Sequence, residues 1–209
     1  PSGWFSRLTA RRCASSRSSP SSTSCDSVCW PGGHLTGRTR RLRLFVAAMP
    51  DWVTVNRLRE ACGGWPRPKV AGLRWTGPDQ WHVTLHFLGS VDPGEAAAAL
   101  DGLGSVAAEA RLGPATALLG QGVLMVPVRG VDDLAGAVAE ATVDLGGSPE
   151  DRPFTGHLTL GRSRGRVPAG WEGRPVTGAF PVVEVCLVRS ETLPEGARYE
   201  VLGRWPLSG

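Results

Sequence analysis

The chain has 209 residues, 41% of them hydrophobic, which is enough for a hydrophobic core in one or two lobes. Its net charge of +4 arises in residues 1–43, which carry eight arginines and one acidic residue, whereas residues 44–209 carry 15 basic and 18 acidic residues. The overall basicity is therefore no argument for a nucleic-acid partner. No apolar run approaches the roughly 20 residues that span a bilayer, so we expect a cytoplasmic protein without a membrane segment.

Residues 1–41 are rich in serine and arginine and show no hydrophobic period. This composition buries too little apolar surface to offset the entropy lost on ordering, so we predict a disordered tail. An arm that binds RNA is the functional alternative for this segment. From residue 42 onward the apolar patterning is continuous, and we predict a single folded domain over residues 42–209.

Apolar periodicity and turn residues predict the elements of this domain in chain order. They are a strand over Leu42–Ala48, a helix opened by Asp51 and closed by Gly63 and Gly64, strands over Leu73–Trp75 and 81–88, a helix from Asp92 to about Ala110, strands over 115–119 and 123–128, a helix opened by Asp132 and closed by Gly146 and Gly147, and strands over 157–162, 182–189 and 198–205. Strands and helices do not alternate strictly, which favours an α+β fold with antiparallel sheets in two similar halves.

Two tetrads, 75 residues apart, carry the functional signal: His82-Val83-Thr84-Leu85 and His157-Leu158-Thr159-Leu160. In a strand, residues i and i+2 point to the same face. The apolar members are expected to face the core, which leaves one imidazole and one hydroxyl on the open face of each copy. If the copies face one another, they form a site with two acid–base groups and two hydrogen-bond donors.

Such a site suits chemistry on a phosphate diester. One neutral histidine takes a proton from water, and one protonated histidine gives a proton to the departing oxygen. Thr84 and Thr159 donate hydrogen bonds to phosphate oxygens, where charge develops in the transition state. This scheme requires no metal or other cofactor, so we predict catalytic residues His82 and His157 and no metal site.

Residues five positions after each histidine complete the candidate site. Arg162 follows His157 and is near enough to add positive charge, although its side chain is expected to begin on the other face. Phe87 follows His82 and is either a core residue or a platform for stacking a base. His86 shares a face with His82 in a regular strand, but about 13 Å separates them along it, which disfavours a zinc pair.

The residues around both tetrads resemble the two-histidine phosphoesterases, and among them the bacterial and archaeal RNA 2′,3′-cyclic phosphodiesterases (LigT-like). The similar segments span about residues 42–207: Arg43-Leu44-Phe45-Val46-Ala47, Leu73-Arg74-Trp75, 81–89, 152–162, 187–191 and 197–202. The resemblance implies a bilobal fold with two pseudo-symmetric antiparallel sheets, helices on the outside and a central cleft. Two positions depart from the family pattern: His86 replaces a small or basic residue, and Gly156 replaces a frequent proline.

The resemblance also implies hydrolysis of RNA 2′,3′-cyclic phosphates to 2′-phosphomonoesters. His82 would donate a proton to the leaving 3′ oxygen, His157 would activate water, and Thr84, Thr159 and Arg162 would bind the phosphate. Some relatives also join RNA ends through a 2′–5′ linkage. Two alternatives stay open: a phosphodiesterase acting on a small cyclic nucleotide or ADP-ribose cyclic phosphate, and a non-catalytic RNA-binding module. We expect a monomer.

Overall fold

The computed structural model describes residues 40–63, 69–104, 106–145, 153–193 and 196–207. The predicted tail, residues 1–41, lies outside this part of the chain except for its last two residues. The elements are β1 (Leu42–Ala48), α1 (Trp52–Ala61), β2 (Leu73–Trp75), η1 (Pro78–Gln80), β3 (Val83–Val91), α2 (Pro93–Asp101), β4 (Ala108–Leu112), β5 (Ala117–Leu119), β6 (Val123–Arg129), α3 (Asp132–Ala141), η2 (Val143–Leu145), β7 (His157–Ser163), β8 (Gly178–Val182), β9 (Glu184–Leu193) and β10 (Gly196–Pro206).

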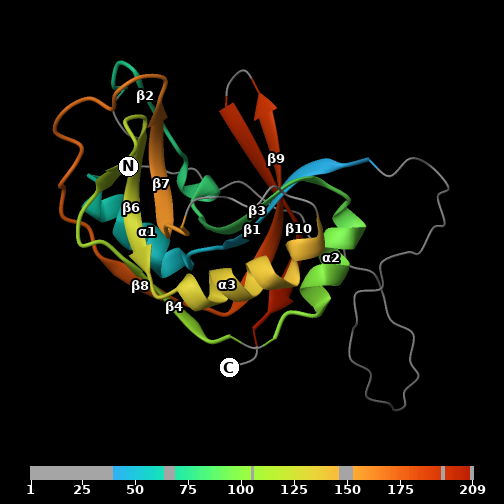
Figure 1. The fold of residues 1–209 in the computed structure, drawn as a ribbon. Coiled ribbons are helices and arrows are strands. Elements are labelled where there is room, and N and C mark those ends of the chain that lie inside the picture. The colour runs from blue at the N-terminus through green and yellow to red at the C-terminus, as the bar shows by residue number, and fades with distance from the viewer. Residues whose placement is uncertain (1–39, 64–68, 105, 146–152, 194–195, 208–209) are drawn as a thin grey trace, which may run out of the picture. The chain divides into compact units, whose positions relative to one another are not determined.

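The strands follow one another in the order β10-β9-β1-β3-β7-β6-β4-β8, with β2 beside β7 and β5 beside β6, and these pairings are antiparallel (Figure 1). The first four strands of this order form one half and the last four form the other. This is the α+β architecture with two antiparallel halves that the sequence predicted. The halves are continuous, because β3 pairs with β7 across the junction.

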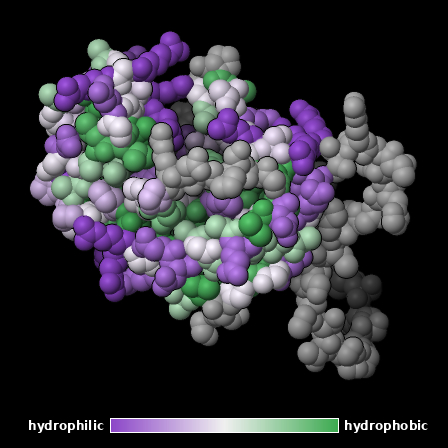
Figure 2. Space-filling view, viewed as in Figure 1, coloured by the Kyte–Doolittle hydropathy of each residue, from purple (hydrophilic) through white to green (hydrophobic). Residues whose placement is uncertain are grey.

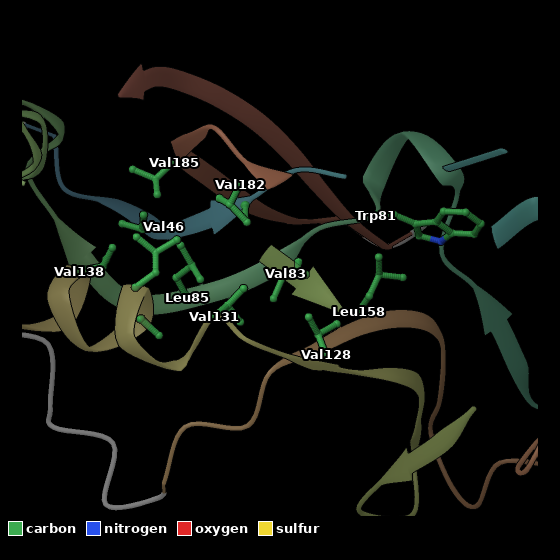
Figure 3. Packing of buried hydrophobic residues seen from close by; sticks show 14 of the residues in the cluster. Val46, Trp81, Val83, Leu85, Val128, Val131, Val138, Leu158, Val182 and Val185 are labelled. Atoms are coloured by element: carbon green, nitrogen blue, oxygen red, sulfur yellow. The ribbon is translucent and has the colours of Figure 1, made fainter. Parts of the chain in front are cut away.

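A main core joins both halves. It contains Val46 and Val83 from one half and Val128 and Leu158 from the other, and α3 adds Val138 (Figure 3). The helices α1 and α2 also bury residues in this core. All three helices bury side chains in this one core. The opposite face of the central strands is therefore not packed against a helix.

A second, smaller cluster occupies that opposite face of β1 and β9. Phe45 and Ala47 alternate along β1 with the residues of the main core, so β1 is buried on both faces. Cys186 and Val188 of β9 complete the cluster, and Tyr199 of β10 packs against it. This cluster lies next to the first tetrad, because Phe45 contacts the ring of His82.

The three helices begin near the predicted aspartates, and α1 and α2 are capped by a side chain that bonds to the first turn, whereas α3 begins at Asp132 without a side-chain cap. Asp51 accepts a hydrogen bond from the Thr54 amide at 2.7 Å, and Asp92 accepts from the Gly94 and Glu95 amides at 2.8 and 3.0 Å. In the described part of the chain, no helix is long and apolar enough to cross a membrane.

Several boundaries differ from the predictions, including the following three. The helix expected to reach Ala110 ends at Asp101, where Gly102 forms the C-cap, and residues 108–112 form β4 instead. Alanine is compatible with a helix, but pairing with β6 and β8 draws this segment into the sheet. Strand β8 was not predicted as a separate element, and β3 begins two residues later than expected. The glycines expected to close the third helix lie outside the described residues.

Candidate active site

The two tetrads meet where β3 lies beside β7. Val83 pairs with Leu158, and both side chains are fully buried in the main core. Paired residues of antiparallel strands share a face, and successive residues of a strand alternate between faces. The neighbours of Val83 and Leu158 therefore point away from the core. These neighbours are His82, Thr84, His157 and Thr159, and all four line one cavity of about 840 Å³.

A β-bulge lies at the last residue of each tetrad. Leu85 is an extra residue in β3 relative to β1, and Leu160 is an extra residue in β7 relative to β6. An extra residue shifts the alternation of side chains by one position. Phe87 and Arg162, each five residues after a histidine, therefore return to the face that carries the imidazoles, and both line the cavity.

These bulges correct two expectations. Arg162 does not begin on the far face of its strand, because the bulge at Leu160 turns its side chain to the cavity. His86 does not share a face with His82, because the bulge at Leu85 places it opposite Val46 of the main core. Both differences arise from bulges, which are defined by pairing with a neighbouring strand. A prediction that assumes regular alternation within one strand does not include them.

The ring of His82 lies between two aromatic side chains. Phe45 lies 4.9 Å away between ring centroids, and Tyr199 meets His82 edge-on at 4.9 Å and 81°. The pKa of His82 is lowered to about 4, first by burial and then by the positive charges of Arg162 and His157, against the opposing effect of the backbone hydrogen bond to Gln80. The neutral imidazole is therefore the favoured form of His82 in the ligand-free protein at neutral pH.

Both histidines are held by the backbone in the same way. Nδ1 of His82 lies 2.8 Å from the carbonyl oxygen of Gln80, and Nδ1 of His157 lies 2.7 Å from that of Thr155. A carbonyl oxygen only accepts hydrogen bonds, so we assign the proton of each neutral ring to Nδ1. Nε2 of each neutral ring then carries no proton and is available to accept one.

One end of the cavity is apolar. Phe87 is 42% exposed and contacts Phe45 at 5.7 Å, and Phe154 is 36% exposed. Val143 lines the same cavity with an exposed side chain, whereas Leu119 lies near Arg162, because Leu119 pairs with Val123 and Val123 pairs with Arg162. Exposed apolar side chains around a cavity suit an aromatic or apolar portion of a ligand. Sequence reasoning identified Phe87 but missed Phe154, whose position three residues before His157 was the available signal.

The helix α3 forms a wall of the cavity with small residues, including Ala135, Gly136 and Ala139. Just after this helix, Thr142 donates a hydrogen bond to the carbonyl oxygen of Val138 at 2.7 Å. Its hydroxyl oxygen therefore accepts the proton on Nδ1 of His86, which lies 2.9 Å away. His86 thus lines the cavity as part of the α3 wall.

Metal-ligating side chains do not gather in the described part of the chain. No group of three or more histidine, cysteine, aspartate or glutamate residues lies close enough there to hold an ion. Since Leu85 shifts the alternation of β3, His82 and His86 also do not present their rings as a pair on one face.

Comparison with known proteins gives matches in sequence and in structure. The family model described as LigT like Phosphoesterase matches residues 54–113, which include the first tetrad. The RNA 2′,3′-cyclic phosphodiesterase of Geobacillus stearothermophilus is 31% identical over 153 residues, which is 65% of this chain and 48% of that protein. The chain therefore spans about half the length of this curated relative.

Two solved structures share the fold over nearly their whole length. TT0787 of Thermus thermophilus is 29% identical with a TM-score of 0.66, and the match covers 79% of this chain and 98% of that one. E. coli LigT in its apo form is 26% identical with a TM-score of 0.64, and the match covers 81% and 99% of the two chains.

Antiparallel halves that bring two histidines into one cavity, together with these neighbours, define a two-histidine phosphoesterase fold. Within this class, the chain is similar in sequence and in structure to LigT-like phosphoesterases.

Proposed function

We propose that this protein hydrolyses the 2′,3′-cyclic phosphate at an RNA end to a 2′-phosphomonoester, with His82 and His157 dividing the proton transfers. The observation that carries the proposal is the cavity in which both imidazoles, both threonine hydroxyls and Arg162 converge. The relative from Geobacillus stearothermophilus, which is an RNA 2′,3′-cyclic phosphodiesterase, supports this choice of substrate.

In the proposed complex the phosphate lies between the two tetrads. Thr84 and Thr159 donate hydrogen bonds to its non-bridging oxygens, and Arg162 supplies positive charge beside them. The base of the terminal nucleotide stacks at the apolar end of the cavity, against Phe87 and Phe154.

Hydrolysis then proceeds by one displacement at phosphorus. Nε2 of His157 takes a proton from a water molecule, whose oxygen forms a new bond to phosphorus. The bond from phosphorus to the 3′ oxygen breaks, and this oxygen receives a proton from Nε2 of His82. The products are a free 3′-hydroxyl and a phosphate that stays on the 2′ oxygen. No step in this scheme requires a metal ion.

The low pKa of His82 implies how the donor obtains its proton. In the ligand-free protein, burial favours the neutral ring. A cyclic phosphate carries one negative charge, and a negative charge beside Nε2 favours the imidazolium form. His82 therefore takes up its proton together with the substrate.

The same geometry supports a ligation reaction. If the 5′-hydroxyl of a second RNA replaces water, the displacement gives a 2′–5′ phosphodiester bond and the same free 3′-hydroxyl.

Because one chain supplies both histidines and both threonines, we propose that the protein acts as a monomer.

The decisive experiment uses an oligonucleotide that ends in a 2′,3′-cyclic phosphate, incubated with the protein in EDTA. Chromatography against 2′- and 3′-phosphate standards is expected to identify the 2′ isomer. A 3′ isomer would contradict the assignment of the leaving oxygen. Turnover restricted to ADP-ribose cyclic phosphate, or tight RNA binding without turnover of any cyclic phosphate, would favour the corresponding alternative function.

A further inference from the structure

A second cavity, also of about 840 Å³, lies beside the candidate active site. Arg162, Ala197 and Tyr199 line both cavities, so the two spaces adjoin. The second cavity lies between the end of β7, with β2 beside it, and the start of β10. Figure 2 shows hydrophilic side chains gathered at the upper end of β2 and β7, where the surface is hollowed toward the β9–β10 hairpin.

The second cavity is strongly basic. Arg74, Arg162, Arg164 and Arg198 line it, and its described lining includes no acidic side chain. The ion pairs found between described residues use other arginines, on β4, β9 and β10. The positive charge of this cavity is therefore not neutralised by a carboxylate in the described part of the chain.

Two of these arginines lie directly opposite one another. Arg74 of β2 pairs with Arg162 of β7, so both side chains leave the sheet on one face. Like charges at paired positions of a sheet repel each other. A bound anion between them removes this repulsion, which makes the pair a candidate phosphate site.

The backbone around the cavity fixes its basic groups. A Cβ atom at Gly196 would lie only 2.6 Å from Cζ of Arg74, so glycine at this position lets the guanidinium lie against the hairpin. The Ser163 hydroxyl accepts a hydrogen bond from the Gly165 amide at 3.1 Å and closes the turn that carries Arg164. Gln80 donates to the carbonyl oxygen of Ala197 at 3.3 Å, which ties the start of β10 to the loop that holds His82.

We propose that this basic cavity binds the phosphodiester backbone of the RNA strand on the 5′ side of the cyclic end, so that the protein prefers oligonucleotides to cyclic mononucleotides. This inference rests on the proposed function of the neighbouring site. A strand that ends in a 2′,3′-cyclic phosphate continues only in the 5′ direction. In this proposal, the next phosphates of the strand leave the catalytic cavity at the end opposite Phe87. They enter the basic cavity beside Arg162, which lines both cavities.

The test compares turnover of 2′,3′-cyclic AMP with that of a tetra-adenylate that ends in the same cyclic phosphate. The wild-type protein is expected to show a higher kcat/KM on the tetranucleotide. Arg74→Ala and Arg198→Ala, on separate elements, are each expected to lower this value about fivefold to tenfold and to leave the mononucleotide value unchanged. Arg166→Ala is the control, because Arg166 belongs to the same turn as Arg164 but does not line the cavity.

Salt provides a second measurement. The kcat/KM for the tetranucleotide is expected to fall with salt concentration more steeply than that for the mononucleotide, and either variant is expected to reduce the difference. Equal kcat/KM for the two substrates, or variants that lower both values alike, would overturn the inference while leaving the proposed function intact. Absence of turnover with both substrates would instead overturn the proposed function and, with it, this inference.

Discussion

Phe87 and Arg162 occupy equivalent places in the two halves of the protein. Each lies five residues after its histidine, and each is turned to the cavity by a bulge at the last residue of its tetrad. One copy of the repeated strand thus supplies an aromatic ring and the other supplies a cation. The two strands are nearly symmetric, but they differ in this one side chain. The difference gives the cavity an apolar end at Phe87 and a basic end at Arg162.

Loss of either imidazole is expected to nearly abolish turnover. His82→Ala and His157→Ala each remove one proton transfer, which predicts a decrease in kcat of about 10²- to 10⁴-fold on 2′,3′-cyclic AMP. Circular dichroism is expected to show the wild-type fold, because both rings face the cavity. His86→Ala is the matched control and is expected to retain most activity. Either active-site variant with more than half of the wild-type kcat would contradict the acid–base assignment.

The titration of His82 is expected to respond to phosphate. NMR of the imidazole protons should give a pKa of about 4 for His82 in the ligand-free protein. Added 2′-AMP should raise this pKa, because its phosphate favours the imidazolium form. An unchanged pKa in the presence of saturating 2′-AMP would show that His82 does not face the bound phosphate.

The same pKa predicts how stability depends on pH. Since the pKa of His82 is lower in the folded than in the unfolded protein, its contribution to the free energy of unfolding is full above about pH 6.5 and is lost as the pH falls toward 4. Urea unfolding at several pH values should show a smaller decrease over this interval for His82→Gln than for the wild type. Tyr199→Ala, which exposes the ring, should also reduce it, whereas Tyr199→Phe should not.

Some parts of this structure are local enough to be predicted from the sequence. The alternation in each tetrad identifies which side chains face the core, and Asp51 and Asp92 identify the helix starts, because each rule relates residues within four positions. The two halves follow from the repetition of the tetrad. That the tetrads meet in space depends on Val83 and Leu158, whose burial the same alternation predicts.

Other parts depend on partners far away in the sequence. The bulges at Leu85 and Leu160 exist only relative to β1 and β6, and β4 becomes a strand because it pairs with β6 and β8. The burial of His82 requires Tyr199, which lies far along the chain on β10. A pattern within one segment contains no information about such pairings, which explains why the face of Arg162 was predicted wrongly and why the alternation of a regular strand does not hold at His86.

Removal of the Phe87 ring is expected to weaken nucleotide binding and leave the chemistry intact. If a base stacks on this ring, Phe87→Ala should raise KM for 2′,3′-cyclic AMP about tenfold with little change in kcat. Phe87→Trp should restore or improve KM, because any aromatic ring provides the stacking surface. Trp52→Ala is the control, since Trp52 is 76% exposed and does not line the cavity. A KM for Phe87→Ala equal to that of the wild type would show that Phe87 packs against Phe45 and does not stack on the base.

Removal of a threonine hydroxyl tests the geometry of the phosphate site. Valine has nearly the shape of threonine and suits a strand, so Thr84→Val and Thr159→Val should keep the fold while removing one donor each. Each substitution is expected to lower kcat by about 10²-fold, as for loss of one donor to a developing negative charge. Because the tetrads are paired around Val83 and Leu158, the two losses should be similar in size. Thr177→Val is the control, because Thr177 is exposed and does not line the cavity. A loss confined to one of the two threonines would show that the phosphate is held by one tetrad and not between both.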